Sequence, residues 1–170
     1  KVGNGLEEGI QMGPLQSKDK KERVVGYIEK GIAEGAKLAL DGRKIRLEGN
    51  LPQTCFLNPS VFVDVGRQMT IAREEIFGPV ACIMRADDME AAIDMIHASP
   101  FGNAASIYTA NGGWAREFEY KVQTGNIGIN IGIVAPMAFF PFSTWASRSL
   151  GKGRNMRRRT RPTLIPFSLY

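Results

Sequence analysis

Short apolar β-type runs alternate with amphipathic helical stretches along most of this chain, and this alternation limits the folds open to it. Helical spacing of apolar residues predicts helices over 18–34, with Ser17 as N-cap, and over 87–99, while Asn111 can cap a third helix that reaches about Val122. The expected strands are 36–40, a broken β segment at 56–65, 79–85, 105–109 and 125–131. Strands alternating with helices of about ten or more residues favour crossover connections. The sequence therefore predicts an α/β fold, a three-layer αβα sandwich with a mostly parallel sheet.

The composition is that of a globular domain. Hydrophobic residues make up 44% of the 170 residues and charged residues 23%. No apolar run approaches the roughly 18 residues that a membrane-spanning helix needs, and the first residues carry no export signal. Cys55 and Cys82 are too few for a disulfide framework and fit a reducing compartment, so we expect a cytoplasmic protein. Lys1 stands where a start methionine would, which indicates a processed product or a fragment.

The net charge of +5 comes from the end of the chain. Residues 148–170 hold seven basic residues and no acidic one, which leaves 15 basic and 17 acidic residues, a net of −2, in residues 1–147. We expect 1–147 to be the globular part, and 148–170 to be disordered or to derive from a shifted reading frame. An alternative function is a non-catalytic interaction or nucleic-acid-binding module built on RNMRRRTR (154–161), because clustered arginines attract phosphate. No recognition helix, aromatic platform or zinc spacing accompanies this run, so nucleic acid is not an expected partner.

One segment, MTIAREEIFGPV (69–80), is far more specific than the rest. It resembles the motif of the aldehyde dehydrogenase superfamily, in which two acidic residues precede an aliphatic residue and Phe-Gly-Pro. The resemblance extends over about residues 1–146 and includes GYIEKG, LDGR, NPSVF, SPFGNAASIYT and GNIGIN. The stretch APMAFFPFS followed by Trp145 is similar to the CoA-acylating methylmalonate-semialdehyde dehydrogenase branch, whose members also act on malonate semialdehyde. The resemblance implies the catalytic-domain fold of that superfamily, in incomplete form.

The resemblance gives roles to two residues of this motif. Glu75 would accept hydrogen bonds from the ribose hydroxyls beside the nicotinamide of NAD, because two carboxylate oxygens can take two adjacent hydroxyls. Phe77 would lie against the nicotinamide ring and orient it for hydride transfer. The alternative is that Glu74 and Glu75 are a solvated pair and Phe77 a core aromatic. The matches on both sides of the motif favour the cofactor site.

The aromatic run before the tail is the second candidate. In the resembling enzymes this loop borders the aldehyde tunnel, where apolar walls exclude water from a thioester intermediate. Phe142 is the expected substrate-wall residue, although each aromatic here could equally anchor the loop to the core. Thr144 stands where the family motif usually has glycine, so the loop need not turn as in the family.

Other polar residues carry weaker hypotheses. Asn130 follows an expected strand and could bond near the site, or it could cap the strand end. Lys20 and Arg23 fall where relatives contact the adenosine side of NAD, but a solvated helix face explains them better. His97 is the sole histidine of the chain, and a surface or core role is favoured over a catalytic base.

Parts of the machinery implied by the family are missing from the sequence. The family nucleophile resides in a Gly-Gln-x-Cys motif that this chain lacks, and Cys55 and Cys82 have no neighbouring basic residue to activate them. A Gly-rich strand–turn–helix for the NAD pyrophosphate is also missing. We therefore expect a chain inactive by itself, with no catalytic residue and no metal. The remainder of an aldehyde dehydrogenase chain would be its partner, CoA the co-substrate, and a homo-oligomer the assembly of the intact enzyme.

Overall fold

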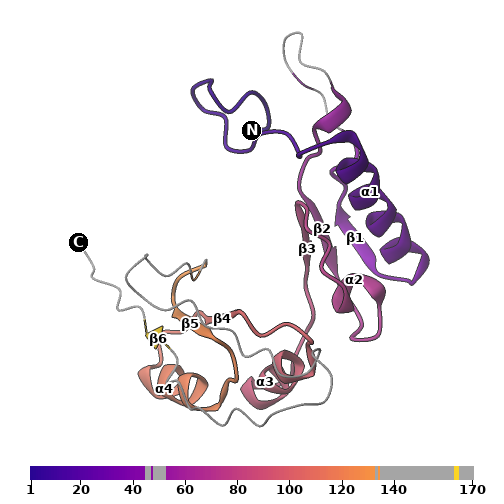
Figure 1. Ribbon diagram of the computed structural model, residues 1–170. Coiled ribbons are helices and arrows are strands. Elements are labelled where there is room, and N and C mark those ends of the chain that lie inside the picture. The colour runs from indigo at the N-terminus through magenta and orange to yellow at the C-terminus, as the bar shows by residue number, and fades with distance from the viewer. Residues whose placement is uncertain (45–46, 48–52, 133, 135–162, 165–170) are drawn as a thin grey trace, which may run out of the picture. The chain divides into compact units, whose positions relative to one another are not determined.

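The computed structural model describes residues 1–44, 47, 53–132, 134 and 163–164, and it divides the chain into two compact units, Lys1–Arg85 and Ala86–Tyr170. Each unit contains its own three-stranded sheet and its own helices (Figure 1). The chain therefore has the α/β class expected from the sequence. Of the four strand pairings within the described residues, three are parallel, which also confirms the mostly parallel arrangement.

The first unit is built around helix α1, Lys18–Ala33. Its start is local in origin, because the Ser17 side chain accepts a hydrogen bond from the Lys20 N–H at 3.2 Å. Its end is local as well, since Gly35 adopts a φ of +93° that a glycine reaches without steric cost. The expected helix over 18–34 is therefore confirmed to within one residue.

The sheet of the first unit has the order β1–β2–β3, with β1 antiparallel to β2 and β2 parallel to β3. Its strands are β1 (Lys37–Leu40), β2 (Ser60–Val63) and β3 (Val80–Cys82). The 3-10 turn η1 (Gln53–Cys55) precedes β2, and the short helix α2 (Thr70–Arg73) lies between β2 and β3. The strand expected over 79–85 is thus shorter than the sequence indicated, and α2 was not anticipated.

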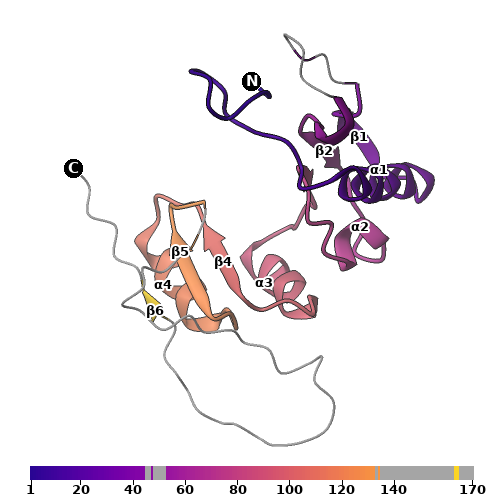
Figure 2. The same ribbon diagram turned by 45° about the horizontal axis from the view of Figure 1, so that its top comes forward.

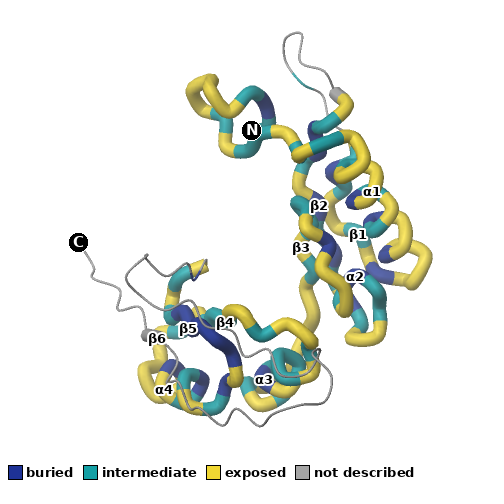
Figure 3. Tube along the Cα trace, viewed as in Figure 1, coloured by how far each residue is buried: buried dark blue, intermediate teal, exposed yellow. Residues whose placement is uncertain are grey.

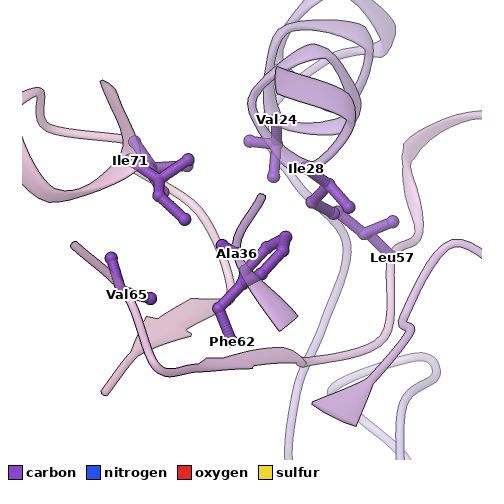
Figure 4. Packing of buried hydrophobic residues seen from close by; sticks show 8 residues of the cluster. Val24, Ile28, Ala36, Leu57, Phe62, Val65 and Ile71 are labelled. Atoms are coloured by element: carbon purple, nitrogen blue, oxygen red, sulfur yellow. The ribbon is translucent and has the colours of Figure 1, made fainter. Parts of the chain in front are cut away.

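Both helices of this unit pack on the same face of the sheet. Figure 4 shows Val24 and Ile28 of α1 and Ile71 of α2 converging on Phe62 of β2. Val24, Ile28 and Phe62 are fully buried. Because about 25 cal/mol is gained per Å² of apolar surface removed from water, this cluster is the main source of stability for the unit.

A tight turn follows β1. The Asp41 carboxylate accepts from the Arg43 guanidinium at both oxygens, from Nε at 2.9 Å and 3.2 Å and from a terminal nitrogen at 2.7 Å. These bonds lower the pKa of Asp41 to about 2. The LDGR motif noted in the sequence is therefore a turn closed by its own ion pair.

The second unit contains helices α3 (Met89–Ala98) and α4 (Gly112–Lys121). Its sheet has the parallel order β4–β5–β6, with β4 (Ala104–Ile107), β5 (Asn126–Ile129) and β6 (Thr163–Leu164). Figure 2 shows β4 and β5 side by side, and Figure 3 shows β5 buried over most of its length.

Local caps again place the helices of this unit. The Asp88 side chain accepts from the Ala91 N–H at the start of α3, and Asn111 accepts from two amides at the start of α4, as expected. The core joins Ile93 of α3, Phe118 of α4 and Ile127 of β5. Of the basic tail expected over 148–170, the structure describes Thr163–Leu164, which form β6; the arginine run 154–161 lies outside the described residues.

Candidate functional site

The acidic motif forms a turn between α2 and β3. The turn begins where the Glu74 N–H donates to the Thr70 carbonyl at 2.9 Å and ends where the Ser60 N–H donates to the Pro79 carbonyl at 2.8 Å. Residues 74–79 are called the acidic turn below. Because the Pro79 carbonyl accepts from the first residue of β2, the end of the turn is joined to the sheet.

One stripe of helix α1 holds the acidic turn and α2 from the side. The stripe consists of residues spaced by four, four and three positions, so that they share one helix face. They are Arg23, Tyr27, Gly31 and Glu34. This is called the α1 stripe below.

The N-terminal end of the α1 stripe contacts the acidic turn directly. The Arg23 guanidinium donates from one nitrogen to the Ile76 carbonyl at 2.5 Å and from another to the Glu75 carbonyl at 2.9 Å. It also lies over the Tyr27 ring, 4.9 Å from the ring centroid. The Tyr27 hydroxyl donates to a carboxylate oxygen of Glu74 at 2.8 Å, and this bond raises the pKa of Tyr27. The backbone of the turn and its first acid are therefore both attached to the helix.

The C-terminal end of the α1 stripe contacts α2. The Glu34 carboxylate accepts from the N–H of Thr70 at 2.6 Å and from its hydroxyl at 2.5 Å, which lowers the pKa of Glu34. Thr70 is the first residue of α2, and its preceding residue, Met69, makes no side-chain cap. Glu34 therefore caps α2 from 36 positions away in the sequence.

Two glycines permit this close packing. A Cβ atom on Gly31 would lie 2.9 Å from a methyl carbon of Ile71, and one on Gly78 would lie 2.5 Å from a methyl carbon of Val24. Side-chain carbons normally approach no closer than about 3.5 Å. Gly31 therefore lets α2 reach the helix, and Gly78 lets the acidic turn reach it.

The two residues with cofactor hypotheses point into solvent. Phe77 is 79% exposed, so the alternative that it is a core aromatic is wrong. Its φ of +56° is unusual for a residue with a bulky side chain and costs roughly 1–3 kcal/mol in backbone strain. The Glu75 side chain is also exposed, while the Glu75 carbonyl accepts from Arg23. The turn therefore presents an unburied aromatic ring and an unburied carboxylate two positions apart.

Two of the weaker candidates, Asn130 and His97, make structural contacts. The Asn130 side chain accepts from the Thr109 N–H at 2.8 Å and donates to the Thr109 carbonyl at 3.1 Å, so it joins the ends of β4 and β5. Nε2 of His97 accepts from the Gln123 N–H at 3.1 Å, which ties α3 to the segment before β5. The strand-capping role of Asn130 and the structural role of His97 are therefore the ones that the structure favours.

Lys20 and Arg23 differ in the contacts that their side chains make. The Lys20 side chain is exposed, as a solvated helix face requires. Arg23 is exposed as well, but its guanidinium also donates to two carbonyls and lies over an aromatic ring. The spacing of the α1 stripe, with a glycine inside a helix, was the one sequence signal that could have indicated this contact.

The Cys82 thiol is not activated. Burial raises the pKa of the Cys82 thiol, and its sulfur lies 3.6 Å from the Ile71 carbonyl. Cys55 is half-buried, and both thiols are free. Within the described residues no group of histidine, cysteine and acidic side chains is arranged to hold a metal ion. Phe142, the expected substrate-wall residue, and the aromatic run around it lie outside the described residues.

Comparison with known proteins shows to which family this chain is related. The sequence pattern that defines the Aldehyde dehydrogenase family matches residues 1–158. The chain belongs to the aldehyde dehydrogenase family. The resemblance read from the acidic motif is thereby confirmed, and the mixed α/β fold with small parallel sheets is that of an incomplete aldehyde dehydrogenase domain.

Several of the similar proteins are semialdehyde dehydrogenases. A malonate-semialdehyde dehydrogenase of Listeria monocytogenes is 43% identical over 151 residues, which cover 89% of this chain and 30% of that protein. A Sinorhizobium meliloti protein assigned as a methylmalonate-semialdehyde dehydrogenase and solved with NAD superposes with a TM-score of 0.81, at 36% identity, over 86% of this chain and 30% of its own. The methylmalonate-semialdehyde dehydrogenase of Oceanimonas doudoroffii gives a TM-score of 0.77 at 35% identity, over 85% of this chain and 30% of its own.

These comparisons also give the share of the relatives' length that this chain spans. The aldehyde dehydrogenase chain described here spans about 30% of the length of the curated relatives it matches. In the part of the chain that the structure describes, no helix is long and apolar enough to cross a membrane.

Proposed function

We propose that this chain supplies the nicotinamide-ribose side of the cofactor site in an NAD-dependent dehydrogenase of malonate or methylmalonate semialdehyde. The observation that carries the proposal is the acidic turn, which holds Glu75 and Phe77 exposed on a backbone fixed to α1. A carboxylate accepts from vicinal hydroxyls, and an aromatic face suits a flat heteroaromatic ring. Family membership and the NAD bound to the S. meliloti protein support NAD as the ligand.

The proposed roles of Glu75 and Phe77 follow from the chemistry of their side chains. Bound NAD would accept a hydride from the substrate. Glu75 would hold the ribose hydroxyls, and Phe77 would limit the positions open to the nicotinamide ring. The strained backbone at Phe77 supports this role, because strain of this kind is found where a side chain must be aimed.

The remaining parts of the reaction are proposed from the family alone. The nucleophile and the pyrophosphate site would come from the remainder of an aldehyde dehydrogenase chain, CoA would be the acyl acceptor, and the intact enzyme would be a homo-oligomer. Phe142 would line the aldehyde tunnel. The two free thiols fit a reducing compartment, so we place the enzyme in the cytoplasm.

The test is saturation-transfer NMR on the 170-residue chain with NAD+. If the chain carries the nicotinamide-ribose side alone, transfer to the nicotinamide protons will exceed transfer to the adenine protons. Glu75→Ala and Phe77→Ala should each weaken this transfer, and the loss of a charge-assisted pair corresponds to roughly tenfold in affinity. Glu74→Gln is the matched control, because its amide oxygen can still accept from Tyr27. Equal transfer to both ends of NAD+, or equal loss in the control, would contradict the proposal.

A further inference from the structure

The acidic turn contains two neighbouring glutamates whose surroundings differ. The Glu74 carboxylate accepts from Tyr27 of the α1 stripe at 2.8 Å. The Glu75 residue is held by its carbonyl, 2.9 Å from the Arg23 guanidinium, and its exposed side chain extends into solvent. The same helix thus engages one acid through its side chain and the other through its backbone.

The shape of the Arg23 guanidinium suits it to hold the backbone of the acidic turn. Its planar fork donates from two different nitrogens to two successive carbonyls, at 2.5 Å and 2.9 Å. Fixing two consecutive carbonyls fixes the peptide planes that lead into Phe77, the residue with the φ of +56°. A lysine carries the same charge but donates from a single nitrogen, so it could not hold both carbonyls in the same way.

Tyr27 completes the arrangement. Its ring lies under the Arg23 guanidinium, 4.9 Å away, and its hydroxyl holds Glu74. The ring restricts the guanidinium, and the hydroxyl keeps the Glu74 carboxylate beside α1. Both glutamates are exposed, and Tyr27 holds one carboxylate oxygen of Glu74 beside the helix.

We infer that Arg23 and Tyr27 are positioning residues of the cofactor site: they hold the backbone of the acidic turn and the Glu74 carboxylate, and so aim Phe77 and Glu75. This inference rests on the function proposed above. It adds that the turn depends on side chains of α1 for the position of its two cofactor residues.

The experiment uses the full 170-residue chain and two separate measurements. Amide hydrogen exchange of the Glu74 and Val80 N–H groups, which donate to the Thr70 and Gly78 carbonyls at the two ends of the turn, reports how firmly the turn is held, without any ligand. Saturation transfer from the protein to the nicotinamide protons of NAD+, titrated to give a Kd, reports the cofactor role. The variants are Arg23→Met, Arg23→Lys and Tyr27→Phe. Lys30→Met is the matched control, because it removes a positive charge from an exposed position on the same helix.

Arg23→Met should speed exchange of the Glu74 and Val80 amides by roughly tenfold, with β2 amides unchanged, and should raise the Kd for NAD+ by a similar factor. Arg23→Lys should recover part of both losses, and Tyr27→Phe should show a smaller version of each. Lys30→Met should show neither. Unchanged exchange at Glu74 and Val80, or a uniform rise throughout residues 1–85, would overturn the positioning role. So would faster exchange with an unaltered Kd.

The failure of the proposed function would look different. If the unsubstituted chain shows no nicotinamide-selective transfer, the cofactor role of the turn is overturned, and that of Arg23 with it. Exchange of the Glu74 and Val80 amides would still decide whether Arg23 holds the turn. Rescue by lysine separates this from a general loss of folding, because Arg23→Lys keeps the charge and most of the side-chain volume.

Discussion

Replacing Gly78 by alanine should show how tightly the acidic turn is fitted against α1. The added Cβ would lie 2.5 Å and 2.9 Å from the two methyl carbons of Val24. A normal contact requires about 3.5 Å, so about 1 Å of separation must be found. Val24 is fully buried, and a valine within a helix has essentially one χ1 rotamer, so its methyls cannot turn away. The turn must then move off the helix and lengthen its bonds to Arg23.

The expected cost of Gly78→Ala is that of an overpacked core, about 1–3 kcal/mol in the free energy of unfolding. For a cooperative unit the size of residues 1–85, each 1 kcal/mol corresponds to a fall of roughly 4–8 °C in Tm. Gly26→Ala is the control, because a Cβ there meets nothing within 4 Å. Inside a helix this change should instead stabilise the chain by about 0.5–1 kcal/mol.

A double-mutant cycle with Val24→Ala makes the test sharper. Urea unfolding followed by circular dichroism would give the free energies of the two single variants and the double variant. Removing the two methyls that cause the clash should make Gly78→Ala nearly neutral in the Val24→Ala background, a coupling of about 1 kcal/mol or more. The reasoning is refuted if the two effects are additive, or if Gly78→Ala and Gly26→Ala change the stability alike.

Three further predictions follow from contacts elsewhere in the chain. Because the pKa of Asp41 is lowered to about 2 by Arg43, its stabilising effect is present above the usual pKa and is lost as the pH falls through about 2. Asp41→Asn should therefore flatten the fall in Tm between about pH 4 and pH 2, and an unchanged pH profile would contradict this. Asn130→Ala loses both bonds to Thr109, and Asn130→Asp keeps one acceptor but sets a second oxygen against the Thr109 carbonyl, so each should destabilise the chain by about 1 kcal/mol or more in urea unfolding; an unchanged stability in both variants would contradict this. With the other cysteine replaced by serine, Cys82 should react slowly with iodoacetamide at neutral pH and faster as the pH rises, because burial raises its pKa; a rapid reaction at neutral pH would show an activated thiol instead.

The elements that the sequence predicts well are those with local causes. Ser17, Asp88 and Asn111 each accept from amides two or three positions further on, and a cap of this kind is visible in the order of residues. Helix α2 has no such cause. Its cap is Glu34, 36 positions earlier, and its four residues are too few for a periodic pattern.

The candidate site was predictable by motif but not by geometry. The acidic motif identified Glu75 and Phe77, yet hydrophobicity alone would have buried Phe77, which the turn exposes. Arg23 was predictable only in part. It is exposed, as a solvated helix face requires, but its polarity did not indicate its partners, which are carbonyls 52 and 53 positions away. Contacts of this range follow from how the chain packs, and a single sequence carries no direct record of them.

The attachment of the acidic turn to α1 bears on how such enzymes can be recombined. Exchanging the acidic turn alone between two family members would combine the turn of one protein with the α1 stripe of another. The side chains of that stripe need not fit the new turn. A crossover between residues 35 and 68 would likewise separate Arg23, Tyr27 and Glu34 from their partners. A crossover at the boundary between residues 85 and 86 keeps them together. Helix α1 and the acidic turn therefore have to come from the same parent. A shuffled library with crossovers between residues 85 and 86 should contain more folded members than one with crossovers between residues 35 and 68.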